Sequence, residues 1–181
     1  MINYKKNKNI SEPYLYLYNS RLRYEASLHL KKHPKFIPSI TQVQASFILT
    51  GTMIENKIPL LGALDLITKQ PGKIQRSKIN VSGSKTNERL KLFATMRRNV
   101  KFNFLKRLFA ITSPEDIFFD KHSYRFNNGI IYLVFNQAYL FHELKDIYPY
   151  GFIPPLYVEI HTTAQTLEEA RDLLFYYQIG G

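Results

Sequence analysis

The sequence predicts an α+β domain in which helices pack on one side of a largely antiparallel sheet, preceded by a basic N-terminal arm. Segments of alternating apolar and polar residues predict half-buried strands, and apolar residues at helical spacing predict amphipathic helices. The predicted order of elements along the chain is β-α-β-β-α-β-β-α. A hydrophobic content of 45% with 22% charged residues indicates a globular chain, and 181 residues suffice for one domain with an added arm.

The predicted arm comprises residues 1–35 and the predicted domain residues 36–181. The arm carries eight Lys or Arg residues and two acids, and its tyrosines include Tyr14, Tyr16 and Tyr18. Residues 23–32 predict a short helix within it. The opening residues MINYKKNKN lack the apolar region of a secretory signal, and they are not Arg- and Ser-rich as a transit peptide would be.

The first half of the domain begins with strict alternation in residues 41–49, which predicts a half-buried strand. Residues 58–67 carry leucines and isoleucines at helical spacing, and the Gln-Pro-Gly that starts at Gln70 predicts the end of that helix. Two further strands are predicted at residues 73–79 and 90–97. The polar stretch NVSGSKTNER lies between them and predicts a connecting loop.

The second half begins with a predicted helix that Asn99 could cap, and Val100, Phe104 and Leu108 form its apolar stripe. A polar loop follows, and the continuous apolar run IIYLVF predicts a strand covered on both faces. Residues 156–161 alternate again and predict the last strand. Thr166 and Glu169 have the spacing of a capping box, which predicts the start of the final helix.

Positive charge is concentrated in the middle of the chain. Residues 69–107 contain twelve Lys or Arg residues and one acid, whereas residues 108–181 carry a net charge of −5. The whole chain carries +11. A basic region beside a mildly acidic one predicts a polyanionic partner on one side of the molecule. The alternative is a surface charged only for solubility, on which both signs would be interspersed.

The motifs of common enzyme and metal sites are absent from the sequence. There is no GxGxxG, GxxxxGK[ST] or HExxH segment, and the absence of cysteine excludes disulfides and thiolate metal sites. His29 and His33 are four residues apart, but Pro34 disfavours a helix there. No apolar run approaches the ~20 residues that span a bilayer. We therefore predict no catalytic residue, no metal, no cofactor and no membrane partner.

The basic segment has the features of an RNA-binding surface. Its Lys and Arg residues recur every two to four positions and could follow a phosphate backbone. Gly83 lies between two serines and would let the loop approach phosphate closely. Phe93 shares a strand face with Lys91 and Arg97, where it could stack on a base or instead belong to a core. The predicted RNA-binding residues are Lys73, Arg76, Lys78, Gly83, Ser84, Lys85, Arg89, Lys91, Phe93, Arg97, Arg98 and Lys101.

The segment HTTAQTLEEARDLL near the C-terminus resembles the ending of universal large-subunit ribosomal protein five. That family ends its last strand with Thr-Thr-Ala and begins its final helix with a polar residue and two acids. The resemblance extends upstream from about Pro38, through IPSITQVQASFILT, KQPGKIQRSK, LFATMRRNVKFNFLKRL and FNNG. This sequence departs from the family at Ser46, where the family usually carries Asn, and at SPEDIFFDK, where an Arg-rich segment is replaced.

The resemblance implies a structural constituent of the large ribosomal subunit, located in the central protuberance. Its implied partners are large-subunit rRNA, 5S rRNA where present, neighbouring central-protuberance proteins and small-subunit ribosomal protein thirteen. The loop with Gly83, Ser84 and Lys85 would contact P-site tRNA. The composition is rich in Lys, Asn and Ile, with 13 Phe, 13 Tyr and no Trp, which suggests an A/T-rich organelle genome. The expected location is therefore the mitochondrial ribosome, with a plastid or a bacterial cytoplasm as the alternatives.

Two other classes of function stay open at this point. One is a basic RNA-processing or RNA-modifying enzyme, which would show turnover with RNA substrates. The other is a peripheral membrane protein held at an anionic surface by its basic arm, which would float with liposomes.

Overall fold

In the computed structural model, a six-stranded antiparallel sheet has the strand order β2-β3-β1-β6-β5-β4. The structure describes Tyr24 and residues 37–79, 87–112, 124–136, 138–145 and 153–179. Apart from Tyr24, the predicted arm lies outside these residues. The strands are β1 (Ile40–Thr50), β2 (Lys73–Ile79), β3 (Asn87–Met96), β4 (Tyr124–Asn127), β5 (Ile130–Phe135) and β6 (Leu156–Thr162). The helices are η2 (Gly51–Asn56), α2 (Lys57–Thr68), α3 (Arg98–Ile111), η3 (Ala138–Leu140), α5 (His142–Lys145) and α6 (Leu167–Ile179).

The sheet buries one of its faces, as the alternation in the sequence predicts. Val43, Ala45, Phe47 and Leu49 of β1 are fully buried on that face. Apolar side chains of β3, β5 and β6 extend the same layer. β1 lies between β3 and β6 at the centre of the sheet, so the longest alternating segment of the sequence becomes its central strand.

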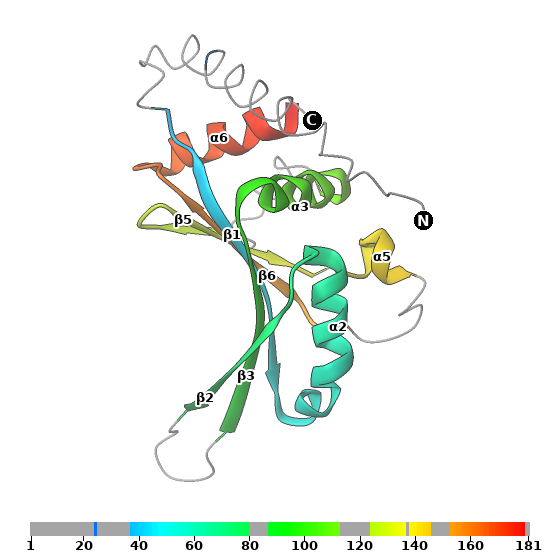
Figure 1. Cartoon of the computed structure of the whole chain (residues 1–181). Helices are drawn as coiled ribbons and strands as arrows, with labels where there is room; N and C mark the ends of the chain where they lie inside the picture. The colour runs from blue at the N-terminus through cyan, green and yellow to red at the C-terminus, as the bar shows by residue number, and fades with distance from the viewer. Residues whose placement is uncertain are drawn as a thin grey trace, which may run out of the picture.

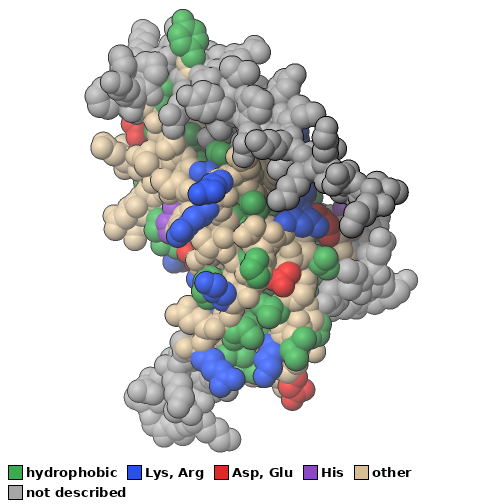
Figure 2. Space-filling view, in the orientation of Figure 1, with side chains coloured by type: hydrophobic (Ala, Val, Ile, Leu, Met, Phe, Trp, Pro, Cys, Tyr) green, Lys and Arg blue, Asp and Glu red, His purple; other side chains and the backbone are tan. Residues whose placement is uncertain are grey.

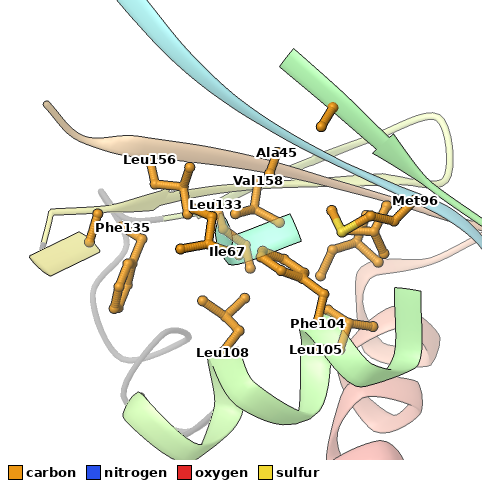
Figure 3. Close-up of a cluster of buried hydrophobic side chains, with 14 of the residues drawn as sticks. Ala45, Ile67, Met96, Phe104, Leu105, Leu108, Leu133, Phe135, Leu156 and Val158 are labelled. Carbon is orange, nitrogen blue, oxygen red and sulfur yellow. The ribbon is translucent and has the colours of Figure 1, made fainter. Parts of the chain in front are cut away.

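Helices cover the buried face. Figure 1 shows α2, α3 and α5 on one side of the sheet, and α6 contacts α3. In the close-up of Figure 3, Phe104, Leu105 and Leu108 of α3 point toward Leu133 and Val158 of the sheet. One cluster of buried side chains joins all these elements. The predicted α+β class, with a largely antiparallel sheet and helices on one side, is therefore confirmed. No described helix covers the opposite face, which we call the open face.

β4 and α5 are two elements of the second half that the sequence does not predict. β4 is only four residues long, and it pairs with β5 through a tight turn at Asn128 and Gly129. Both turn residues have positive φ, 48° and 77°, which is the combination that an Asn-Gly hairpin turn requires. The other missed element is α5, a single helical turn. Neither segment is long enough to show a clear periodicity in the sequence.

Arg107 connects three helices beneath the sheet. Its guanidinium on α3 forms an ion pair with Glu143 of α5 and donates a hydrogen bond of 2.6 Å to the carbonyl oxygen of Ile67 on α2. Partial burial raises the pKa of the Glu143 carboxyl. The backbone N–H of Glu143, the Arg107 guanidinium and the Lys69 ammonium together outweigh that effect and hold this pKa below its usual range. The pair thus stabilises the packing of α5 when the carboxylate is charged.

Candidate nucleic-acid interface

The interface begins at the turn between α2 and β2, which determines where Lys73 lies. The carboxylate of Asp65 accepts the backbone N–H of Gly72 at 2.6 Å. A Cβ atom at Gly72 would lie 2.6 Å from Cδ1 of Leu61, so a larger residue there would force the Leu61 and Asp65 side chains to shift. The close approach of this turn to α2 places the start of β2 beside the end of β3.

A basic hollow of about 580 Å³ lies at this corner, between the start of β2, the end of β3 and the start of α3. Lys73, Arg97 and Arg98 supply its cations, and no described Asp or Glu forms an ion pair with them. The Arg97 Nε donates a hydrogen bond of 3.3 Å to the Gln42 side chain. Gln70, Pro71, Thr95 and Val100 complete the lining.

The start of α3 adds to the positive potential of the hollow. No side chain caps this helix, and its first turn contains no acidic residue. The positive end of the helix dipole is therefore uncompensated beside the three cations. Arg98 has φ of 51°, a left-handed conformation that costs a non-glycine residue roughly 1 kcal/mol. The structure thus places a cationic side chain where glycine would be the less strained residue.

The open face continues from the hollow across the sheet. Register places Lys73 opposite Phe93, Phe93 opposite Ser46 and Ser46 opposite Tyr157, so the four residues form one row across four strands. In the space-filling view of Figure 2, Lys and Arg side chains are spread along the molecule from the level of α3 to the β2–β3 end.

Polar side chains form a connected network on the open face. The Lys91 ammonium forms an ion pair of 2.8 Å with the Glu159 carboxylate. Gln44 donates a 3.5 Å hydrogen bond to that carboxylate and accepts one of 3.4 Å from Thr95. His161 Nε2 lies 3.9 Å from Glu159 and completes an ion pair only when protonated. Lys91 therefore has an intramolecular partner that a polyanion would have to displace.

Eleven of the twelve predicted RNA-binding residues fall into four groups. Lys73, Arg89, Lys91, Phe93 and Arg97 lie on the open face, and Arg98 lies at the start of α3. Arg76 faces the helix side, because register places it opposite the buried Leu90. Lys78 lies in β2 opposite Glu88, but its side chain is outside the described part of the structure, as are Gly83, Ser84 and Lys85.

Lys101 differs most from its prediction. It is 8% exposed, and its ammonium donates hydrogen bonds to the backbone carbonyls of Ile40 and Thr41, the second at 3.1 Å. The pairing of β1 with β6 shifts register between Ile40 and Gln42, so the ammonium binds the backbone at an irregular part of the strand. Lys101 therefore stabilises an irregular strand, and we leave it out of the candidate interface.

Sequence reasoning also missed residues that the fold brings to the interface. Gln70 and Thr95 line the hollow. Glu159 forms an ion pair with Lys91, which is 68 positions away in the sequence. Their positions depend on strand register, which no local pattern reports. Among the described residues, no group of three His, Asp or Glu side chains could hold a metal ion. No described helix is long and apolar enough to cross a membrane.

Comparisons with known proteins give structural neighbours alone. No family model and no curated protein matches the chain. Among solved structures, the chain is similar to Mth689, a DUF54 protein from Methanothermobacter thermautotrophicus, with 14% identity and a TM-score of 0.46 over 75% of this chain and 92% of that one. It is also similar to SSO0741 from Sulfolobus solfataricus, described as DUF54, with 14% identity and a TM-score of 0.45 over 74% and 97%.

Proposed function

We propose that the protein binds folded RNA through the basic hollow and the adjoining open face. The observation that carries this proposal is the group of Lys73, Arg97 and Arg98 around one hollow, with no acidic partner among the residues that the structure describes. Three cations beside an uncapped helix start repel one another, and a phosphate group would relieve that repulsion. Phosphate contacts of this kind supply most of the affinity of RNA-binding surfaces that do not read sequence.

We further propose that this RNA is ribosomal and that the protein is a non-catalytic constituent of a large ribosomal subunit. Support comes from the sequence resemblance described above, which includes the ending from His161 and the segment with Thr95 and Arg97. On this proposal the partners are large-subunit rRNA, 5S rRNA where present, P-site tRNA and neighbouring ribosomal proteins. The A/T-type composition favours a mitochondrial ribosome.

Charge reversal at the hollow tests the proposal. In the full chain, Lys73→Glu combined with Arg97→Glu should release the protein from large-subunit particles in sucrose gradients at moderate salt. Purified protein should also lose affinity for structured RNA, with a dependence on log salt that is shallower by about 2, since each lost phosphate contact removes about 0.9. Arg171→Glu on α6 combined with Lys106→Glu on α3 also reverses two exposed cations, away from the hollow, and serves as the matched control.

The control should stay with the particles and keep the salt dependence of the unmodified protein. Equal retention of the Lys73→Glu, Arg97→Glu variant and the control in the gradient fractions would show that the hollow does not bind the RNA of the particle. Turnover of RNA by the purified protein would instead favour the processing-enzyme alternative.

A further inference from the structure

Ser46 is an anomaly on the open face. Its neighbours on this face, Gln44 and Ile48, are partly exposed, whereas Ser46 is 1% exposed. Its hydroxyl has no hydrogen-bond partner among the described residues. A buried hydroxyl without a partner costs folding free energy, so such a group in a native structure calls for a physical reason.

The Lys91–Glu159 ion pair crosses β1 at the position of Ser46. Lys91 is on β3 opposite Ile48, and Glu159 is on β6 opposite Gln44. The pair therefore spans the central strand β1 diagonally, and Ser46 lies between the two positions that it connects. The Lys91 and Glu159 side chains are 30% and 21% exposed. Solvent therefore reaches the ion pair, and an RNA phosphate could compete for the Lys91 ammonium.

Two aromatic side chains flank Ser46 on the same face. Phe93 stands on one side and Tyr157 on the other, and both are partly exposed. Neither ring contacts another ring or a cation within the described structure. Two strand spacings of about 4.8 Å separate their backbones by roughly 10 Å. Rings on both sides of one stacked base need about 7 Å between their planes, at 3.4 Å per stacking step. The two rings would therefore lean toward each other by about 3 Å in total to hold a single inserted base.

We propose that Phe93, Ser46 and Tyr157 form a slot for one unpaired nucleobase, which the Lys91–Glu159 ion pair closes in the free protein. A phosphate of the bound strand takes Lys91 from Glu159 and opens the slot. The base then stacks between the two rings, and the Ser46 hydroxyl hydrogen-bonds to its edge. This inference rests on the proposed RNA-binding function and adds that the open face binds single-stranded RNA.

A short single-stranded RNA that carries one 2-aminopurine, together with a duplex of the same length, tests the slot. Fluorescence anisotropy gives the affinity, and quenching of 2-aminopurine reports stacking. Phe93→Leu and Tyr157→Leu should each weaken single-strand binding about tenfold and abolish the quenching, because base–aromatic stacking has that magnitude. Duplex binding should change less than twofold. Tyr139→Leu, a change at an exposed aromatic residue of η3 outside the sheet, is the control and should leave both readouts unchanged.

Glu159→Gln distinguishes the opening of the slot from a simple change in charge. It should strengthen single-strand binding more than duplex binding, and this difference should vanish in a Glu159→Gln, Phe93→Leu double variant. Equal gains for both RNAs would show that only charge changed and would overturn the closing role of the ion pair.

Unchanged single-strand affinity and quenching in both Leu variants would overturn the slot. If Lys73→Glu still weakened RNA binding in that case, the proposed RNA-binding function would stand without the slot. Failure of the unmodified protein to bind either RNA would overturn the function and the slot together.

Discussion

Replacement of Lys101 by Met separates a structural role from an RNA-binding role for one buried cation. The Lys101 ammonium donates to two backbone carbonyls where β1 departs from regular pairing, and it lies 4.7 Å from the centre of the Phe102 ring. Hydrogen bonds from charged donors contribute roughly 1.5–3 kcal/mol each. Met keeps most of the apolar stem and avoids burying a charge, which offsets part of the loss. We expect the free energy of unfolding to fall by about 2–4 kcal/mol.

Urea unfolding followed by far-UV circular dichroism measures this change, since the chain has no Trp for fluorescence. The midpoint should fall while the dependence on urea concentration stays the same. A loss of this size corresponds to a melting temperature lower by roughly 5–15 °C in a domain of this length. Lys106→Met on the exposed side of α3 is the control and should change stability by no more than about 0.5 kcal/mol.

Two results would refute this reasoning. Equal urea midpoints for Lys101→Met and Lys106→Met would show that the two carbonyls do not need the ammonium. A Lys101→Met protein of normal stability that binds RNA less tightly would show that the side chain reaches RNA, as the sequence alone predicts.

Three further changes give predictions of different kinds. Arg98→Gly should raise stability by about 1 kcal/mol, because it relieves a φ of 51°, yet weaken RNA binding through the loss of one cation; a lower urea midpoint would contradict the assigned conformation. Gly129→Ala should cost about 2–3 kcal/mol, since φ is 77° and the new Cβ would lie 2.9 Å from the Thr162 carbonyl oxygen; an unchanged urea midpoint would contradict this tight turn. Glu143→Gln should destabilise the protein at pH 7. Because the folded pKa of Glu143 is lowered, its contribution is present above the unfolded value of about 4.3 and is lost as pH falls through the folded pKa. The difference in urea midpoints should therefore shrink by pH 3, and equal differences at both pH values would exclude the ion pair with Arg107 as its cause.

The fold could be predicted where local patterns are long. Alternation in β1 and the apolar stripe of α3 specify both the element and its buried face, because burial follows the period of the backbone. The capping box was also predicted, and the structure shows Thr166 accepting the Glu169 N–H at 3.3 Å. The Glu169 carboxylate, however, accepts the N–H of Gln165 rather than that of Thr166.

The candidate site could be predicted only in part, because its geometry depends on register and packing. Lys73 and Arg76 are three positions apart in one strand, so they necessarily project from opposite faces. Composition groups them together, and only the sheet separates them. Lys101 lies outside the apolar stripe of its helix, yet it is buried because the irregular part of β1 passes beside it. Ser46 is an ordinary polar position in the sequence, and only strand register shows that an ion pair from two other strands crosses β1 there.

The position of β1 between β3 and β6 has a consequence for how the chain matures. Gln44 of β1 and Glu159 of β6 are 115 positions apart in the sequence, yet they are neighbours in the sheet. During synthesis, β1 can pair with β3 early, but its other edge stays unpaired until β6 leaves the ribosome that makes it. Unpaired strand edges are prone to wrong associations, and distant pairings form slowly. The part of the open face that contains Tyr157 and Glu159 is therefore assembled last, so an incomplete chain cannot present it.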